Sequence, residues 1–140
     1  EYIMPNATDN SNLSSLFEKL IFNNDGLIPV IAQQYDSHEV LMLAWMNKQA
    51  ITETFETGRV CYYSRSRQKL WRKGEISNQI QTLKNFRIDC DGDTILLLVD
   101  QIGVACHTGR RNCFYEEVSS DGKIKIIADV LKNPDDLYNK

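Results

Sequence analysis

The sequence predicts a mainly β domain of the α+β class, with small packed β-sheets and about two helices. Short apolar runs rich in Val, Ile and Leu recur along the chain, and clusters of turn-type residues separate them. Only two stretches carry the capping residues and apolar spacing typical of helices. The composition, 42% hydrophobic and 25% charged, is ordinary for a globular protein and argues against disorder. We therefore expect one packed domain over residues 13–132, between a polar leader (residues 1–12) and a polar tail (residues 133–140).

The two predicted helices lie in the first half of the chain. The serines at residues 14–15 precede a group of apolar residues, which predicts a short capped helix that ends near the turn cluster at residues 23–26. Asn47 can cap a second helix that runs to about Thr57, and Gly58 supplies its stop signal.

Seven apolar runs are predicted to form strands. They cover residues 27–34, 40–45, 60–64, 80–88, 94–99, 113–118 and 123–127. A short polar segment separates the first two runs, so a hairpin is the economical assignment there. The Asp121–Gly122 pair is typical of a hairpin turn and joins the last two runs. From Asn133 the chain is polar, and we expect it to fray.

Charge and hydropathy exclude several classes of protein. With 16 basic and 19 acidic residues the net charge is -3, which argues against a protein that coats nucleic acid. No apolar stretch approaches the roughly 20 residues that cross a bilayer, and the first residues lack the pattern of a secretory signal. The four cysteines are therefore more consistent with metal binding in a reducing compartment than with disulfides. We expect a cytoplasmic protein with neither a membrane nor a nucleic-acid partner.

Three aspartates, Asp89, Asp91 and Asp93, form what we term the acidic triad. On an extended segment their side chains would share one face, with neighbours about 6.6 Å apart. Close carboxylates repel one another, and a hard divalent cation such as Mg²⁺ removes that repulsion. A solvated acidic turn is the alternative. An EF-hand loop is excluded because Thr94 stands at the sixth position, where that loop needs glycine.

Three cysteines, Cys90, Cys106 and Cys113, lie in or after the acidic triad. Thiolates are usual zinc ligands, and three protein ligands with one open position are typical of a catalytic zinc site. The paired C-x-x-C pattern of zinc fingers is absent, so cysteines that act as small apolar residues are the alternative. Because Cys90 alternates with the aspartates, we expect it to face away from the carboxylates. Cys61 lies in an apolar run and is predicted to be structural.

Residues 64–75 hold five basic residues in an otherwise acidic protein. Arginine and serine side chains are good phosphate donors, and Trp71 offers a face on which a base can stack. A second basic cluster, Arg110 and Arg111, follows His107 closely. Two basic clusters around candidate metal sites indicate a small ligand with two phosphates rather than a polymer. A solvated basic loop is the alternative interpretation of the first cluster.

Five segments form an ordered set of motifs. They are DGLIPVIAQ (residues 25–33), YSRSR (63–67), LWRKGE (70–75), DCDGD (89–93) and ACHTGRRNCF (105–114). Together they resemble the motifs of the phosphoribosyl-AMP cyclohydrolase family. The resemblance implies an intertwined homodimer that uses zinc and magnesium in histidine biosynthesis. It also implies hydrolysis of the purine bond between N1 and C6 of 1-(5-phosphoribosyl)-AMP, which opens the ring.

Carried onto this sequence, the resemblance implies roles for particular residues. Cys90, Cys106 and Cys113 would bind the catalytic zinc, with one cysteine supplied by the partner subunit, and the acidic triad would bind magnesium. His107 is expected to transfer a proton, because it stands beside a zinc ligand. Substrate contacts are expected from both basic clusters and their neighbours, namely Ser64, Arg65, Ser66, Arg67, Trp71, Lys73, Glu75, Ser77, Thr108, Arg110 and Arg111.

The chain departs from the family pattern at Ile76, Asn78 and Asn112, where Thr, Gly and Ser are common. Since asparagine tolerates left-handed backbone better than most residues, we expect a modest effect at residue 78. Two rival functions stay open on the residues alone. One is a zinc-stabilised module that binds a nucleotide or nucleic acid without catalysis. The other is a metal-dependent hydrolase of phosphate esters, although its two metals would lie only about 3.5–4 Å apart.

Overall fold

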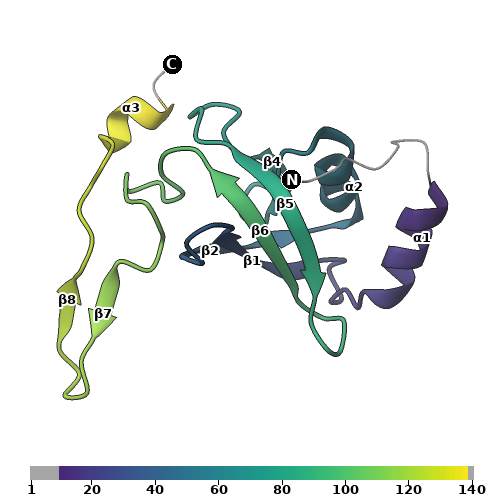
Figure 1. The fold of residues 1–140 in the computed structure, drawn as a ribbon, viewed down its shortest axis with the longest axis horizontal. Helices are drawn as coiled ribbons and strands as arrows, with labels where there is room; N and C mark the ends of the chain where they lie inside the picture. Colours follow the sequence, from purple (N-terminus) through teal and green to yellow (C-terminus); the bar gives the residue numbers. More distant parts are fainter. Residues whose placement is uncertain (1–9, 139–140) are drawn as a thin grey trace.

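The computed structural model describes residues 10–138, so most of the predicted leader lies outside the described residues. At its centre is a four-stranded sheet in the order β2-β1-β6-β5 (Figure 1). The strands are β1 (Ile28–Gln34), β2 (Val40–Met46), β5 (Gln81–Ile88) and β6 (Ile95–Gln101). β1 pairs with β2 and β5 with β6 in antiparallel fashion, while β1 and β6 run parallel. This arrangement confirms the predicted α+β class.

Two further hairpins flank this sheet. β3 (Cys61–Ser64) pairs with β4 (Lys69–Arg72), and β7 (Glu116–Val118) pairs with β8 (Ile124–Ile126). The β7–β8 hairpin stands away from the central sheet (Figure 1). β4 was not predicted, and it rules out a continuous solvated loop over residues 64–75, the alternative interpretation of that basic segment. Residues 113–115 were predicted to begin a strand, but β7 starts only at Glu116.

Helix α2 (Lys48–Thr57) confirms its predicted capping signals. The Asn47 side chain accepts a hydrogen bond of 2.8 Å from the Ala50 backbone N–H. Gly58 ends the helix in the left-handed region, with φ of 74°. Helix α1 (Asn10–Lys19) differs from its prediction, since it begins before the serines expected to cap it and inside the predicted leader.

Helix α3 (Pro134–Tyr138) lies where we predicted a frayed tail. Its first turn is ordered by Asn133, whose side-chain oxygen accepts a hydrogen bond of 3.0 Å from the Asp135 N–H. Leu137 is buried and anchors the helix to the rest of the chain. The prediction of fraying is therefore wrong for residues 134–138.

The hydrophobic core lies on the central sheet. Burial alternates strictly along β1, so one of its faces is covered throughout. In β6, Ile95, Leu97 and Val99 are fully buried. Cys61 joins this core with 1% of its surface exposed, as predicted for a structural cysteine. None of the helices in the described part of the chain has the length and apolar character needed to cross a membrane.

Candidate active site

The segment after β6, residues 103–113, brings two cysteines together, and we term it the cysteine loop. Cys106 is buried, and the Thr108 hydroxyl donates to its sulfur at 3.0 Å. The Cys113 residue is exposed overall, but its sulfur is partly buried. This burial is the main cause that raises the pKa of the Cys113 thiol to about 12, and the neighbouring Cys106 adds to it. Two adjacent cysteine sulfurs are well suited to a soft cation, whose charge removes the repulsion between their thiolates. This donor pair fits zinc.

Cys90 lies far from this pair within one chain. It occupies the turn between β5 and β6, whereas the cysteine loop follows β6. Strand β6, whose seven residues span about 20 Å at roughly 3.3 Å per residue, lies between the turn that holds Cys90 and the loop that holds Cys106. One chain brings together two of the three cysteines predicted to bind zinc and leaves the third at the opposite end of β6. The prediction that Cys90 alternates with the aspartates on a strand is wrong, because the segment is a turn.

The acidic triad lies in that same turn. One carboxylate oxygen from each of Asp89, Asp91 and Asp93 lies within 4.8 Å of the others, closer than the extended segment we predicted would allow. Within residues 10–138 this is the one group of three or more His, Cys, Asp or Glu side chains so close together. Hydrogen bonding to Asp91 and Asp89 raises the pKa of Asp93. Three carboxylate oxygens this close together fit a hard divalent cation, whose charge removes their mutual repulsion.

The turn that bears the triad is folded by its own backbone. Burial raises the pKa of Asp89, but hydrogen bonds from Asp93 and Thr94 outweigh it, so the net shift is downward. The Asp89 carboxylate accepts from the N–H groups of those two residues at 3.1 and 3.3 Å. Gly92, with φ of 78°, lets the chain after α1 pack directly on the turn, because a Cβ would collide with the Lys19 carbonyl oxygen. The Ile21 N–H then donates to the Gly92 carbonyl at 2.7 Å.

Lys73 is a buried cation that faces the cysteine pair. Only 4% of its surface is exposed, and its ammonium donates to the Gln79 carbonyl at 2.9 Å. Burial lowers the pKa of Lys73 to about 8, and the nearby Cys113 and Cys106 act in the opposite direction. At neutral pH the group is therefore still mostly charged, next to two sulfurs that can become anionic.

The other predicted substrate-binding residues near Lys73 lie partly on the surface and partly in the interior. Ser77 is buried, whereas Glu75 is exposed. Trp71, on β4, packs against Tyr62 with ring centroids 5.6 Å apart. Asn78 adopts the left-handed conformation with φ of 63°, as expected for an asparagine at a position where glycine is common.

The turn between β3 and β4 carries the first basic cluster. Arg65 stacks on the Trp45 ring, with its guanidinium carbon 4.6 Å from the ring centroid. The Ser64 hydroxyl lies 3.4 Å from that of Ser66 and accepts from the Arg67 N–H at 3.3 Å. Trp45 was not predicted as a site residue, and no local signal links it to Arg65.

Tyr138 lies near both this turn and the cysteine pair. Burial raises the pKa of Tyr138, and Cys106 adds to that effect, while Arg67 opposes it. Arg67 and Cys106 thus both lie within electrostatic range of one phenol. The sequence did contain a signal for this residue, because Asn, Pro and Asp at residues 133–135 are typical of a helix start.

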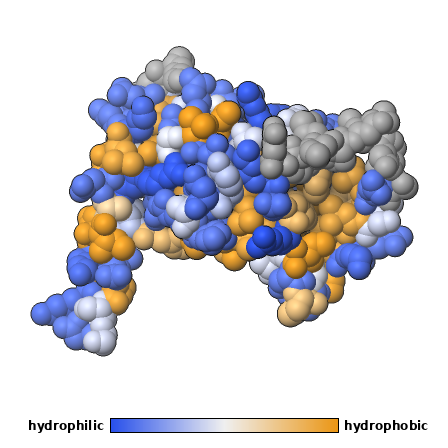
Figure 2. All heavy atoms as spheres, in the orientation of Figure 1, coloured by the Kyte–Doolittle hydropathy of each residue, from blue (hydrophilic) through white to orange (hydrophobic). Residues whose placement is uncertain are grey.

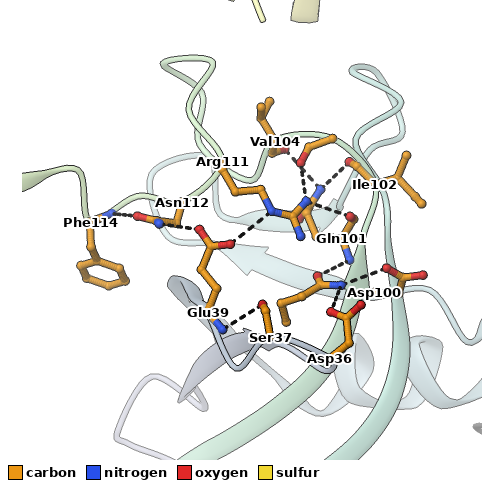
Figure 3. Close-up of polar contacts among 12 residues, drawn as sticks. Asp36, Ser37, Glu39, Asp100, Gln101, Ile102, Val104, Arg111, Asn112 and Phe114 are labelled. Atoms are coloured by element: carbon orange, nitrogen blue, oxygen red, sulfur yellow. Dashed lines mark hydrogen bonds and ion pairs between the residues drawn. The ribbon is translucent and has the colours of Figure 1, made fainter. Parts of the chain in front are cut away.

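The second basic cluster supports the cysteine loop from within the chain. Arg110 stacks on Tyr115 at 4.1 Å and donates to the Ala128 carbonyl at 3.0 Å. One terminal nitrogen of Arg111 donates to the carbonyls of Gln101 at 2.9 Å and Gly103 at 2.6 Å (Figure 3).

Glu39 completes this arrangement from the start of β2. Its carboxylate lies 3.4 Å from the Arg111 Nε and accepts from the Asn112 side chain at 2.7 Å (Figure 3). Sequence reasoning missed Glu39, since 72 residues separate it from Arg111 and only the fold brings them together. His107, the predicted proton-transfer residue, directly follows Cys106 and is exposed.

Comparisons with known proteins agree with these observations. A family model described as phosphoribosyl-AMP cyclohydrolase matches residues 42–115. A protein of that name from Rhodospirillum centenum is 62% identical over 128 residues, which covers 91% of this chain and 96% of the relative. One from Granulibacter bethesdensis is 59% identical over 126 residues, covering 90% of this chain and 98% of the relative. This chain therefore belongs to the phosphoribosyl-AMP cyclohydrolase family.

Proposed function

We propose that this chain hydrolyses the purine bond between N1 and C6 of 1-(5-phosphoribosyl)-AMP, as a cytoplasmic enzyme of L-histidine biosynthesis. Water oxygen bonds to C6, the C6–N1 bond breaks, and N1 takes up a proton, which yields the opened phosphoribosylformimino imidazole carboxamide nucleotide. The names of relatives that match 91% and 90% of the chain support this reaction. The observation that carries the proposal is the pairing of Cys106 with Cys113 beside the exposed His107.

Cys106 and Cys113 would hold zinc together with Cys90 of the partner subunit. When bound, zinc supplies a Lewis acid that lowers the pKa of a water from about 15.7 to about 7. The Thr108 hydroxyl stabilises the Cys106 thiolate through its hydrogen bond of 3.0 Å. His107 follows Cys106 directly, so its imidazole can reach the reacting atoms and deliver the proton that N1 requires.

The homodimer is supported by two features of the chain. The first is the length of β6, about 20 Å at roughly 3.3 Å per residue, which places Cys90 and Cys106 beyond opposite ends of this strand, so we assign the third sulfur to a second copy. The second is the projecting β7–β8 hairpin, in which Val118, Ile124 and Ile126 are more than 60% exposed, at 62%, 64% and 62%. Figure 2 shows apolar atoms along this projecting arm at the lower left. A lone two-stranded hairpin is marginal in water, so a partner surface would stabilise it.

The basic clusters would hold the phosphates of the substrate. Arg65 presents one face to Trp45, which leaves the edges of its guanidinium available for a phosphate. Trp71 would stack on a base, while Glu75 and Ser77 would line the nucleotide site. The residues that we assign to phosphate binding are Arg65, Arg67, Lys73, Arg110 and Arg111, and further substrate contacts would come from Ser64, Ser66 and Thr108. The acidic triad would hold magnesium, which suits its three close carboxylates.

The test of the proposed function follows the ultraviolet absorbance of phosphoribosyl-AMP with zinc and magnesium present, and again after chelation. We expect turnover by the wild type that chelation removes. Cys106→Ser should lose zinc and turnover together, whereas Cys61→Ala, in a cysteine outside the pair, should keep both. Turnover by a zinc-free Cys106→Ser protein would contradict the assignment. Nucleotide binding without any turnover by the wild type would instead favour a non-catalytic module.

A mixing experiment tests whether the zinc site is shared between subunits. Cys90→Ala and Cys106→Ala should each be inactive alone. After the two variants are unfolded and refolded together, each mixed dimer regains one intact site, so about a quarter of wild-type activity should return. If all three ligands came from one chain, the mixture would stay inactive.

A further inference from the structure

Gln79 joins the cysteine loop, which the proposed function assigns to zinc, to the segment that would line the nucleotide site. It belongs to the segment of residues 73–79, and its side-chain oxygen accepts from the Val104 N–H at 2.9 Å, in the cysteine loop. Its side-chain nitrogen donates to the Ser77 carbonyl at 3.0 Å. Its backbone carbonyl accepts from the Lys73 ammonium at 2.9 Å. The oxygen of the side-chain amide thus bonds the cysteine loop, while its nitrogen and the backbone carbonyl of Gln79 bond the segment of residues 73–79.

The cysteine loop is shaped to receive this side chain. Gly103 has φ of 71°, a conformation that glycine adopts at little cost. A Cβ at Gly103 would collide with the Gln79 side-chain oxygen, so the amide occupies the space that any other residue would fill. Two independent properties of residue 103, its backbone conformation and its missing side chain, are therefore matched to Gln79.

Arg111 fixes the same glycine from another side. Its terminal nitrogen donates to the Gly103 carbonyl, and Gly103 stands three residues before Cys106. The Ala105 N–H donates to the Arg111 carbonyl at 2.9 Å, which closes the loop on itself. The Val104 N–H, by contrast, has its partner in Gln79, outside the loop. Arg111 thus sets the shape of the loop, and Gln79 sets its position.

We propose that Gln79 is a positioning residue that fixes Cys106 relative to Lys73 and the buried Ser77. This role rests on the proposed function, since it assumes that Cys106 binds zinc. Loss of the Gln79 amide would let the cysteine loop shift while leaving its internal turns intact. Residues that orient metal ligands at one remove typically change metal affinity by about 10–100-fold when they are lost.

The first test uses Gln79→Met, which keeps a side chain of similar length but replaces the amide oxygen that accepts from the Val104 N–H with a thioether, a much weaker acceptor. Gln49→Ala, an exposed change on α2, is the control. We expect hydrogen exchange at the Val104 amide to accelerate at least tenfold, while the Ala105 amide, bonded within the loop, keeps its protection. Equal protection of Val104 in the variant and the wild type would overturn the proposal, and so would equal acceleration at both amides. This measurement needs neither zinc nor turnover.

The second test measures zinc affinity by competition with a chromophoric chelator. Gln79→Met should weaken zinc binding about tenfold and lower kcat more than it raises KM, since the nucleotide contacts remain. Unchanged zinc affinity would overturn the positioning role. Wild-type protein that binds zinc without turnover would defeat the proposed reaction alone, and the exchange result would still decide the role of Gln79.

A double-mutant cycle then asks whether Gly103 and Gln79 act through each other. Gly103→Ala alone should weaken zinc binding strongly, because the new Cβ displaces the Gln79 amide. With Gln79→Ala present that collision is gone, so the same change should cost at least threefold less in zinc affinity. Additive effects would show that residue 103 acts without Gln79 and would count against the proposal. If Gly103→Ala does not fold, the exchange measurement on Gln79→Met remains decisive.

Discussion

The central sheet and the β7–β8 hairpin are built from the same kinds of residue but differ in what covers them. In β6, Ile95, Leu97 and Val99 are fully buried. In the hairpin, Ile124 and Ile126 are 64% and 62% exposed. An apolar run in the sequence therefore predicts a strand, but it does not predict which surface packs against that strand. The sheet carries its own core, whereas the hairpin needs a partner for the same burial.

The largest expected effect is on stability and tests whether the buried strand and the exposed hairpin differ in packing. Leu97→Ala should lower the free energy of unfolding by about 2–5 kcal/mol, because it removes buried methyl groups and leaves a cavity. Ile124→Ala should lower it by less than about 0.5 kcal/mol at protein concentrations where the chain is monomeric. Urea unfolding of both variants checks this difference. Equal losses would mean that the hairpin is packed within its own chain.

The next effect tests what covers the hairpin. Changing Ile124 and Ile126 together to Asp should weaken the dimer at least tenfold, about 1.4 kcal/mol, because two charges would enter an apolar interface. Sedimentation equilibrium measures the association, and zinc affinity should fall with it if the site is shared. Ser120→Asp, which adds a charge at the hairpin tip without removing apolar surface, serves as control. A dimer of unchanged affinity would contradict the proposed interface.

The smallest expected effect is a pH dependence of stability that comes from Cys61, a buried thiol in the hydrophobic core. Burial, with Glu53 next in importance, raises the pKa of Cys61 from 9.0 to about 12. Between these pH values the unfolded chain releases the thiol proton and the folded chain keeps it, so stability falls as pH rises. The slope approaches about 1.4 kcal/mol per pH unit for one group. Cys61→Ala should lack this slope, which unfolding at pH 8 and pH 10 would reveal. Parallel pH dependences would refute it.

Local signals predicted most of the central architecture. Asn47 and Gly58 mark the ends of α2 within a residue, because a cap is a local hydrogen bond that the sequence encodes directly. β4 was missed because Lys69 and Arg72 surround only two apolar residues, so the basic composition concealed the strand. The acidic triad was predicted on a strand, yet a single glycine, Gly92, turns the chain there.

Contacts set by tertiary topology could not be predicted from local patterns. The pairing of Cys106 with Cys113 is consistent with the motif that contains both, but the separation of Cys90 from them depends on the length of β6. The support of Arg111 by Glu39 joins segments 72 residues apart. Gln79 carried no motif signal at all, because a glutamine that fits against a glycine is visible only in three dimensions.

The parallel pairing of β1 with β6 has a consequence for the order in which the chain folds during synthesis. Each antiparallel hairpin can close as soon as its own two strands leave the ribosome, but Val30 must wait for Ile95, 65 positions later. At translation speeds of about 5–20 residues per second this delay is roughly 3–13 s. The acidic turn and the cysteine loop lie at the two ends of the late strand. The candidate metal ligands of a nascent chain would therefore be in place only after β6 has left the ribosome, when the first hairpin has already formed.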